Sequence, residues 1–501
     1  MKAKTLAGLE VLRRTHLLIA QGALLLAGGR PALAAPFTLG GPGVDPRDFR
    51  VTVFAQGLNY PKGMALLADG SLLVATSAPS GGSTGFYNSI GAVVRLIDSN
   101  GDGVADSPPA VMFSGLPGSL SGLRAAGPLV FVVSTGKQIS ILREGSTPAA
   151  ALGLAGKITF TLPSGWLHPP SDLEVREAPG APGSYELFFQ LGSESNFTPT
   201  ARTATLGSDL GVSGTILGDS IYRVTVTDHG DRLSGSGLTR IATGLRNAAG
   251  YALHPVTGDL YFQDNGIDGL QDPNEPFSAD ELNFISAGEI GGAVEDFGFP
   301  ASYTAYRTGT VVGGSGIQPL VAFQPLPDPT TGEESEGAAE IAFAPAAFPP
   351  SLRGGIFVGF HGKFSQGGLQ NEENALVHAD PETGKYFHLV RPRQAGVGHL
   401  DGLLSTRDSL FVADLSPGGS LSSGSGTGVI YRIQAILFIR GDSNQDGRVD
   451  LSDALSILGF LFLERELGCL DAADANDDGQ VDISDAVAVL FSLLDMIKSF
   501  R

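Results

Sequence analysis

The sequence predicts a mainly β protein: a six-bladed β-propeller, followed by a small all-α module that carries two calcium loops. Short apolar strands alternate with tight turns from residue 49 to about residue 435, and helical periodicity is nearly absent before Ser452. A unit of bend, strand, turn and strand recurs six times in this range. After Ile433 the pattern changes to two twelve-residue acidic loops, each followed by an apolar helix.

Composition and charge bound the class of protein. The chain has 501 residues, of which 42% are hydrophobic, and its formal net charge is −20. This length allows a large core in more than one domain. No basic stripe is present to displace counterions from nucleic acid, so a nucleic-acid partner is excluded. The single cysteine, Cys469, excludes an intrachain disulfide.

Residues 1–34 have the pattern of a signal peptide. Lys2, Lys4, Arg13 and Arg14 precede an apolar run, and Ala32-Leu33-Ala34 offers a small-residue cleavage site. An ordinary secretory signal is favoured over a twin-arginine signal. No later stretch is long and apolar enough to span a bilayer. We therefore expect a secreted or periplasmic protein with no membrane span after signal removal.

The propeller is predicted to extend over residues 36–435. Each of its six units has a first segment, which holds a bend and an apolar strand, and a second apolar strand after a turn. The two segments lie at 57–66 and 71–76, 115–123 and 129–134, 168–175 and 185–191, 250–253 and 259–263, 338–343 and 355–360, and 398–404 and 409–414. Outer strands are predicted at 91–97, 137–142, 220–226, 375–379 and 428–433. At roughly 65 residues per unit the connecting loops must be long, and such loops often carry function. A seven-bladed count is the main alternative.

The fourth unit, residues 244–283, carries polar residues that a blade does not need for stability. Arg246 and Asn247 precede its inner strand, and the next strand is followed by the oxygen-bearing residues Asp264, Asn265, Asp268, Asp280, Glu281 and Asn283. The stretch reads GLRN, then HPVTGDL, DNGID and DELN. In this it closely resembles the glucose/sorbosone dehydrogenase family, which are six-bladed propellers that use pyrroloquinoline quinone (PQQ) and calcium.

The resemblance implies an oxidoreductase that takes hydride from an alcohol or lactol carbon of a sugar. Its base would be His168 in the sequence HPPSDL, and a neutral imidazole with a pKa near neutrality suits that role. The residues that would contact the cofactor are Arg246, Asn247, Lys363 and Asn196. The alternative for His168 is a histidine that merely caps a blade loop.

The last unit departs from the family pattern. Where the family has G-R-P-x-G, this chain has Gly398-His399-Leu400-Asp401-Gly402, so an arginine is absent and an acid is present. A trianionic quinone needs cationic partners. A non-catalytic propeller that binds carbohydrate or protein is therefore the alternative function, and a lactonase-type hydrolase is a weaker one that rests on fold analogy.

A short acidic loop links the first two units. Asp98, Asn100 and Asp102 alternate before a glycine turn and imitate the first half of an EF-hand loop, although Pro109 stands at position twelve. We expect a structural calcium loop here. An exposed Asp-Gly hairpin is the alternative.

The C-terminal module is predicted at residues 440–498, with helices at 454–463 and 486–496. Ligand positions of two calcium loops are occupied by Asp442, Asn444, Asp446, Arg448, Asp450 and Asp453, and by Asp474, Asn476, Asp478, Gln480, Asp482 and Asp485, with position 7 acting through its carbonyl. The pair resembles the dockerin type I module, which implies a cohesin-type partner or cell-surface scaffold. In that family, positions 10 and 11 of each loop help to recognise the partner, and here they are Leu451-Ser452 and Ile483-Ser484. The alternative is a calcium-stapled domain without such a partner.

Overall fold

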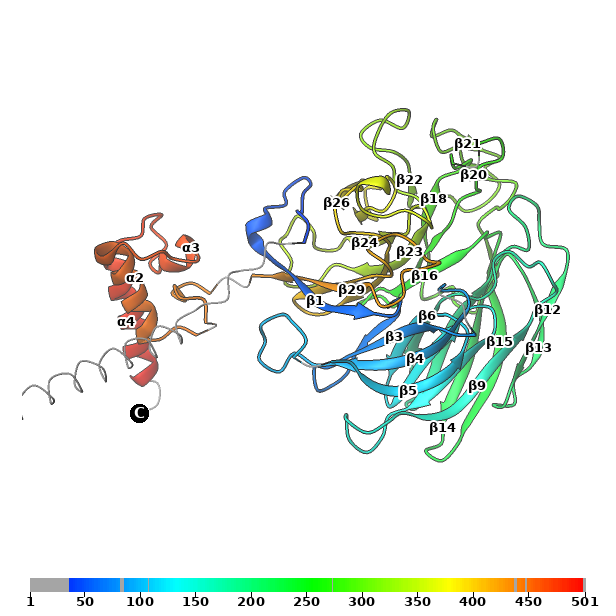
Figure 1. The fold of residues 1–501 in the computed structure, drawn as a ribbon, viewed down its shortest axis with the longest axis horizontal. Coiled ribbons are helices and arrows are strands. Elements are labelled where there is room, and N and C mark those ends of the chain that lie inside the picture. Colours follow the sequence, from blue (N-terminus) through cyan, green and yellow to red (C-terminus); the bar gives the residue numbers. More distant parts are fainter. Residues whose placement is uncertain are drawn as a thin grey trace, which may run out of the picture. The chain divides into compact units, whose positions relative to one another are not determined.

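The computed structural model describes residues 36–81, 85–106, 108–272, 274–436, 439–446 and 448–498, with side chains to residue 493. The predicted signal peptide and Gly447 lie outside this set. In the described part, six β-sheets stand around a common axis (Figure 1). This confirms the predicted mainly β, six-bladed propeller and makes the seven-bladed alternative wrong.

The strands of each blade run in order from the axis outward. Blade one contains β2 (Met64–Leu66), β3 (Leu72–Pro79), β4 (Ser89–Leu96) and β5 (Ala110–Pro117). Blade two contains β6 (Leu120–Ala126), β7 (Leu129–Ser134), β8 (Gln138–Arg143) and β9 (Gly153–Thr161), extended by the hairpin β12 (Thr203–Ser208) and β13 (Gly214–Leu217). Blade three contains β10 (Leu173–Glu177), β11 (Ser184–Leu191), β14 (Ser220–Asp228) and β15 (Leu233–Thr243), with β19 (Glu295–Asp296) parallel to β15.

The remaining blades follow the same plan. Blade four contains β16 (Ala248–Leu253), β17 (Leu260–Asp264), β18 (Asp280–Ile285) and β22 (Val321–Phe323). Blade five contains β23 (Ala338–Phe343), β24 (Ile356–Phe360), β25 (Leu376–Ala379) and β26 (Tyr386–Val390). Blade six contains β27 (Leu400–Ser405), β28 (Ser409–Asp414), β29 (Gly428–Ala435) and β1 (Phe49–Leu58). Short elements in the loops are η1 (Pro46–Asp48), η2 (Gly368–Gln370), β20 (Tyr303–Thr304) and β21 (Val311–Val312).

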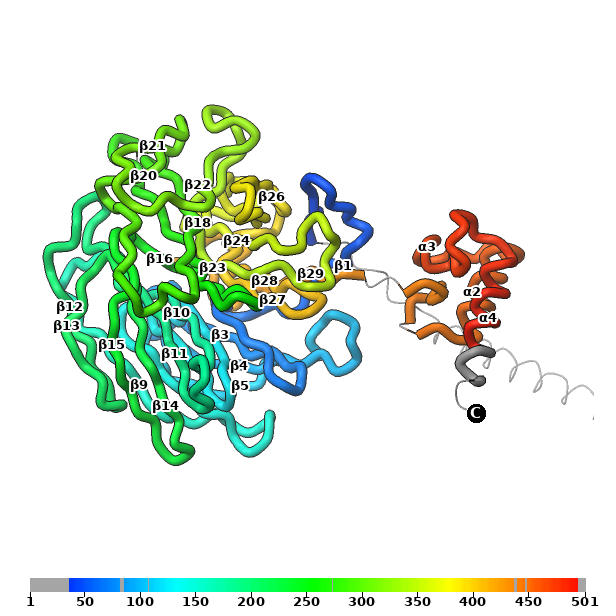
Figure 2. The backbone as a smooth tube through the Cα atoms, turned by 180° about the vertical axis from the view of Figure 1, so that it is seen from behind, coloured from blue at the N-terminus to red at the C-terminus, as the bar shows by residue number. Residues whose placement is uncertain are grey.

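The ring closes on itself. The inner strands contact one another in the order β2, β6, β10, β16, β23, β27 and back to β2. The first strand of the chain, β1, pairs antiparallel with β29 and so completes the last blade (Figure 2). This pairing covers the outer edge of β29, which would otherwise leave a row of unpaired backbone groups.

The core lies between the blades. One apolar cluster fills each of the six interfaces between neighbouring blades; Phe188 of blade three and Phe262 of blade four, for example, belong to the same cluster. Because both faces of a blade are covered, its middle strands are mostly apolar, and every residue of β7 and β28 is buried.

The inner strands share a register irregularity near the axis. In β6, β16 and β27 the pairing with the next strand skips one residue: Ser121, Ala249 and Asp401. A glycine follows each of them. A Cβ atom at Gly250 would lie 1.9 Å from the Ala339 carbonyl oxygen of the next blade. Glycine therefore permits the close approach of neighbouring blades at this level, and the skipped residue is left to line the axis.

Predicted boundaries differ from the structure in the fourth blade and in the C-terminal module. The stretch expected to be an acidic loop to Asn283 ends at Asp280, where β18 begins, because its apolar residues Leu282 and Ile285 enter the sheet and are fully buried. In the C-terminal module, α2 (Leu451–Leu463) and α4 (Ile483–Lys498) each begin three residues earlier than expected. Asp450 caps α2 by accepting a hydrogen bond from the Ser452 amide, which starts the helix sooner.

The C-terminal helices form a small unit with a core of their own. α2 packs on α4, with the short α3 (Leu470–Ala473) between them in sequence. The core of this unit consists of Ala454, Ile457, Ala473, Ala486 and Val489. Within the described residues, no helix has the length and apolar character needed to cross a membrane.

Candidate functional site

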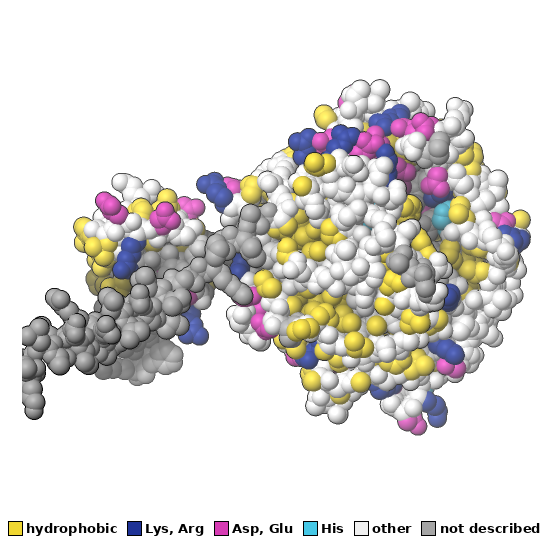
Figure 3. Space-filling model, viewed as in Figure 1, with side chains coloured by type: hydrophobic (Ala, Val, Ile, Leu, Met, Phe, Trp, Pro, Cys, Tyr) yellow, Lys and Arg dark blue, Asp and Glu magenta, His cyan; other side chains and the backbone are white. Residues whose placement is uncertain are grey.

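A cavity of about 790 Å³ opens at the axis of the propeller. All six blades contribute to its wall at or just before the inner strand, through Lys62, Ser121, Ser171, Ala249, Ala339 and Asp401. The wall also carries the exposed side chains of Tyr87, Leu167 and Phe364. In the space-filling view, a histidine and acidic side chains are visible within a hollow of the propeller face (Figure 3). A cavity of this size accommodates a small organic ligand.

His168 lies in this cavity, as its predicted role requires. Its Nδ1 is 2.9 Å from the Ser193 hydroxyl oxygen, and that hydroxyl donates to the Ser195 carbonyl at 2.6 Å. Since Ser193 has one proton to give, Nδ1 carries the hydrogen and Nε2 keeps its lone pair. Burial, and then the positive charge of Arg246, lower the pKa of His168 to about 3. The imidazole is thus neutral, but its pKa is far below the near-neutral value expected for a base.

Arg246 lines the cavity and contacts Asn196, although 50 residues separate them in the chain. The guanidinium is only 3% exposed. Its Nη2 donates to the Asn196 side-chain oxygen at 2.9 Å and forms an ion pair with Asp268 at 2.6 Å. The charge of Arg246 is therefore already balanced by a carboxylate of the fourth blade.

Asn247 is held by an amide network and by Asp264. Its side-chain nitrogen donates to Asn265 Oδ1 at 2.8 Å. The backbone N–H groups of Arg246 and Asn247 donate to the two carboxylate oxygens of Asp264, at 2.9 and 2.5 Å. Burial raises the pKa of Asp264 to about 7 in spite of these two bonds. Asp264 thus fixes the loop that presents Arg246 and Asn247.

Lys363, the other predicted cofactor residue, also lines the cavity. Its ammonium forms ion pairs with Glu372 and, at 3.3 Å, with Glu373. Burial raises the pKa of Glu373 to about 7, against the effect of Lys363. The lysine is therefore not a free cation.

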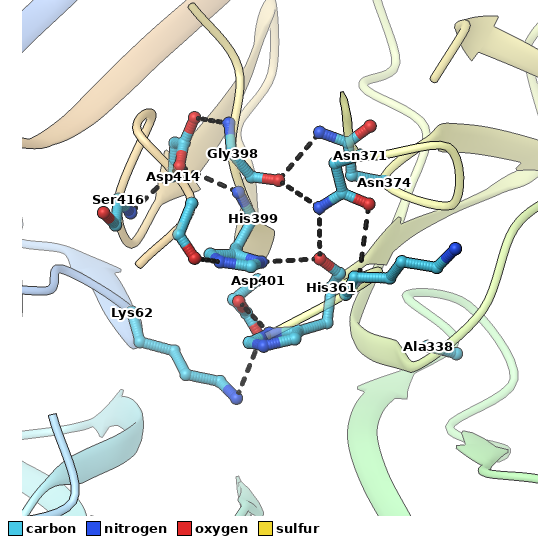
Figure 4. Close-up of polar contacts among 12 residues, drawn as sticks. Lys62, Ala338, His361, Asn371, Asn374, Gly398, His399, Asp401, Asp414 and Ser416 are labelled. Carbon is cyan, nitrogen blue, oxygen red and sulfur yellow. Dashed lines mark hydrogen bonds and ion pairs between the residues drawn. The ribbon is translucent and has the colours of Figure 1, made fainter. Parts of the chain in front are cut away.

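A chain of three charged or ionisable groups crosses the cavity wall from blade one to blade five (Figure 4). His361 Nδ1 lies 2.6 Å from Asp401 Oδ2, and Lys62 Nζ lies 3.4 Å from Asp401 Oδ1. Although burial opposes it, the charges of His361 and Lys62 lower the pKa of Asp401. The sequence pattern singled out Asp401 as a departure but gave no sign of Lys62, which is 339 residues away in the chain.

His399 stands where the family has an arginine, but it does not line the cavity and so does not replace the positive charge of that arginine there. It is fully buried, and its two ring nitrogens lie 2.7 and 2.6 Å from the carbonyl oxygens of His361 and Gly419. The backbone N–H groups of Gly398 and His399 donate to Asp414, as those of Arg246 and Asn247 donate to Asp264. His399 is therefore a structural residue of the blade six loop.

The charges of the wall decide whether a trianionic quinone fits. Three cations line the cavity, Lys62, Arg246 and Lys363, and each forms an ion pair with a carboxylate. Five carboxylates line it: Asp268, Asp280, Glu336, Glu373 and Asp401. Burial, and then the charges of Glu373 and Asp280, raise the pKa of Glu336 well above its usual value. Since every lysine and arginine among the described residues of the wall is already paired with a carboxylate, no free cation remains for a trianionic quinone, and the site does not fit PQQ as it stands.

The acidic residues of the fourth blade serve the backbone. Asp280 accepts hydrogen bonds from the amides of Gly266, at 2.7 Å, and of Ala338 in blade five, at 2.8 Å. It therefore joins two blades. Among the described residues, no group of three or more His, Cys, Asp or Glu side chains is arranged to hold a metal ion.

The two C-terminal loops have the same internal hydrogen bonds. Asp442 and Asp474, at position 1, accept the position 5 amides at 3.1 Å. Asp453 and Asp485, at position 12, accept the amides of positions 3 and 9 at 3.1 and 2.8 Å. The four carboxylates are buried, since none is more than 7% exposed. The two loops thus have the same backbone conformation, held by the carboxylates at positions 1 and 12.

The Asp98 loop has half of this geometry. Asp98 accepts the amides of Asp102 and Gly103 at 3.1 and 3.0 Å, as Asp474 does in its loop. However, the Arg432 guanidinium lies 3.1 Å from the second oxygen of Asp98. The Arg432 guanidinium thus balances the negative charge of Asp98, which a bound calcium ion would otherwise balance.

Comparisons with solved structures show the fold. An iodide structure and a calcium structure of the Carbohydrate-Active Enzymes Family AA12 protein of Trichoderma reesei superpose with TM-scores of 0.53 and 0.51, at 16% and 15% identity, over 80% and 81% of this chain and 99% of theirs. The holo form of the pyranose dehydrogenase PQQ domain of Coprinopsis cinerea gives 0.50 at 14% identity, over 79% of this chain and 97% of that domain. The chain thus has the propeller fold of these proteins.

Sequence comparisons add little. No protein-family model matches the chain. An uncharacterized protein of Borreliella burgdorferi is 43% identical over 60 residues, which are 12% of this chain and 14% of that protein. The match therefore spans about a seventh of the length of that curated relative.

Proposed function

We propose that this chain is an exported carbohydrate-binding protein with two domains, residues 36–435 and 440–498. The axial cavity of the first takes a neutral saccharide. The second binds calcium and attaches the protein to a partner. The observation that carries the saccharide site is the pair of aromatic side chains Tyr87 and Phe364, which line the cavity with 59% and 60% of their surface exposed. Exposed rings can stack on the apolar C–H face of a sugar.

The polar part of the wall supports the same ligand class. Carboxylates such as Glu373 and amides such as Asn247 and Asn265 stand beside the rings and can bind sugar hydroxyls. The three cations are paired with acids, so an anionic ligand meets repulsion without a free countercharge. A neutral polyhydroxylated molecule suits this wall better than a phosphorylated or acidic one.

A PQQ-dependent sugar dehydrogenase is the second candidate. The meeting of His168, Arg246, Asn247 and Asn196 favours it, because these are the residues that the family resemblance assigns to base and cofactor. The paired lysines and Asp401 oppose it. When bound, the quinone would supply the hydride acceptor, but the residues present do not fit it, because their cations are already paired with acids.

The attachment function rests on an exposed apolar surface of the C-terminal module. Side chains at corresponding places after the two loops are exposed: Leu451 and Leu455 on α2, and Ile483 and Val487 on α4, at 42–58%. Such a surface beside calcium loops is suited to a protein partner of the cohesin type. Calcium would be held by the side-chain oxygens of the two loops and the carbonyls at position 7.

A binding screen tests the proposed function. Mature protein is applied to an array of neutral and acidic glycans, and hits are titrated by calorimetry. We expect binding of neutral saccharides, with affinity reduced at least about tenfold in Tyr87→Ala and Phe364→Ala because each removes a stacking ring. Val256→Ala, at a side chain that is 87% exposed and not on the cavity wall, is the matched control. Binding of acidic glycans alone would contradict the proposal, and so would wild-type affinity for neutral saccharides in both aromatic variants.

A further inference from the structure

The cavity contains a second histidine whose surroundings differ from those of His168. His361 is 8% exposed, lines the cavity, and its Nε2 has no hydrogen-bond partner among the described residues. Its Nδ1 faces Asp401 Oδ2 at 2.6 Å. We propose that His361 is a general base, positioned by Asp401, and that the cavity hydrolyses a neutral sugar lactone. This inference rests on the proposed saccharide site and adds a reaction to it.

Asp401 determines which ring nitrogen of His361 carries the hydrogen. Since the pKa of Asp401 is lowered, its carboxylate is ionised and accepts the hydrogen bond. Nδ1 therefore carries the N–H, and Nε2, which is buried in the wall and has no hydrogen-bond partner among the described residues, keeps its lone pair. A carboxylate on one ring nitrogen fixes the tautomer and stabilises the imidazolium that forms when the other nitrogen takes a proton.

The imidazole of His361 is held rigidly. Its ring is stacked on His399, with centroids 4.2 Å apart and planes 19° apart, and the Phe364 ring lies 4.4 Å away on a tilted plane. The His361 amide donates to the Gly337 carbonyl at 2.8 Å. The imidazole is thus fixed both by its own backbone and by its neighbours. A base held in one orientation needs little reorganisation before it reacts.

Three blades meet at this histidine. A Cβ atom at Gly359 would lie 2.0 Å from the Leu400 carbonyl oxygen, and one at Gly402 would lie 2.1 Å from the Lys62 carbonyl oxygen. These two glycines allow blade five to approach blade six, and blade six to approach blade one. His361, Asp401 and Lys62 are brought together by this approach, and Lys62 also lines the cavity wall.

The reaction balances without an oxidant or cofactor. His361 Nε2 takes one proton from a water molecule while the water oxygen forms a bond to the lactone carbonyl carbon. The bond between that carbon and the ring oxygen then breaks, and the imidazolium returns the proton to the ring oxygen. The product is an open-chain hydroxy acid.

The charge of the cavity favours this direction. The substrate is neutral and meets no repulsion from the five carboxylates of the wall. The product is an anion at neutral pH, and since the three cations of the wall are already paired with carboxylates, no free countercharge holds the product in the cavity. The stacking ring of Phe364 is next to His361, so a sugar ring bound on it lies close to Nε2.

The test is hydrolysis of gluconolactone by the full mature chain, with acid release measured in a pH-stat and corrected for the spontaneous rate. We expect catalysis in the wild type and a loss in kcat of about 10²–10⁴-fold in His361→Gln and Asp401→Asn, with KM little changed. Binding of the neutral saccharide found by the array should persist in both variants, which also shows that they are folded. His229→Gln, at an exposed turn outside the cavity, is the matched control and should keep wild-type activity.

The outcomes separate the two proposals. Saccharide binding without lactone hydrolysis overturns the general base and leaves the binding site standing. Hydrolysis that survives both His361→Gln and Asp401→Asn also overturns it. Absence of both binding and hydrolysis overturns the saccharide site as well. A kcat loss confined to His361→Gln, with Asp401→Asn at wild-type rate, contradicts the positioning role of Asp401.

Discussion

Asp401 occupies in blade six the position that Ala249 occupies in blade four. Each is the residue skipped in the pairing of the inner strand with its neighbour, between Leu400 and Gly402 in one blade and between Ala248 and Gly250 in the other. Both line the axial cavity. The blade fold therefore accepts a small uncharged side chain at this position and does not need the carboxylate. The carboxylate of Asp401 belongs to the candidate site.

This equivalence predicts that Asp401→Ala folds normally. Loss of the carboxylate leaves His361 and Lys62 without their shared partner, which costs about 1–3 kcal/mol of unfolding free energy. The measurement is denaturant unfolding followed by circular dichroism. A loss well above this range would show that the blade itself depends on the acid.

The charge of the wall predicts how quinone binding can be gained. Asp401→Ala removes one carboxylate from the cavity and frees Lys62, so affinity for PQQ with calcium should rise about tenfold or more over that of the wild type. Absorbance titration measures it. Asp231→Ala, an equal change in net charge at an exposed residue outside the cavity, is the control and should have no effect. Equal affinity in wild type and Asp401→Ala would refute the charge mismatch.

Buried acids predict a pH dependence of propeller stability. Burial raises the pKa of Glu281 to about 8 and that of Asp264 to about 7. A raised folded pKa means that the stabilisation is complete below the unfolded value near 4 and is lost as the pH rises through 7 to 8. Thermal unfolding should therefore show a propeller that is more stable at about pH 5.5 than at about pH 8.5, and these pH values are chosen on either side of that window.

Glu281→Gln is the matched variant for this effect. It removes the carboxyl group with the higher of the two raised pKa values. At about pH 8.5 it should therefore raise the free energy of unfolding by about 1–2 kcal/mol, and at about pH 5.5 it should change that free energy little. A variant that is stabilised equally at both ends of the range would point to packing and not to titration of Glu281.

Calcium should act on the C-terminal module alone. The position 12 carboxylates of Asp453 and Asp485 are fully buried, and without a cation they and Asp442 and Asp474 repel one another's charge within each loop. Chelation should melt α2 and α4 while the propeller transition stays in place. Calorimetry of wild type and Asp485→Ala, with Asp471→Ala at an exposed residue outside the loops as control, measures this. A propeller transition that shifts with chelation would instead indicate a metal site among the blades.

The blades could be predicted from the sequence because each strand is apolar by itself and each turn has local chemistry. The residues His168, Asn196, Arg246 and Asn247 could be predicted to share a site. The structure places three of them on the cavity wall and joins Asn196 to Arg246 by a hydrogen bond. Their partners could not. Asp268 neutralises Arg246 from an exposed loop, and such a pairing leaves no periodic signal.

The same limit applies to blades five and six. Lys363 was predicted as a cofactor residue from its place after His361-Gly362, but Glu372 and Glu373 pair with it because the loop between β24 and β25 folds back on itself. The contact of Lys62 with Asp401 depends on ring closure, which joins the two ends of the propeller. Ring closure is a property of the whole fold, so local sequence patterns do not contain it.

The most direct test of the central claim is a pair of titrations on one preparation of mature protein, one with the best neutral saccharide and one with PQQ and calcium. We predict saturable saccharide binding and no quinone binding at micromolar concentration, since the lysines and arginine of the wall are paired. Tight quinone binding with sugar-dependent dye reduction, and no binding of free saccharide, would contradict the account and establish the dehydrogenase instead.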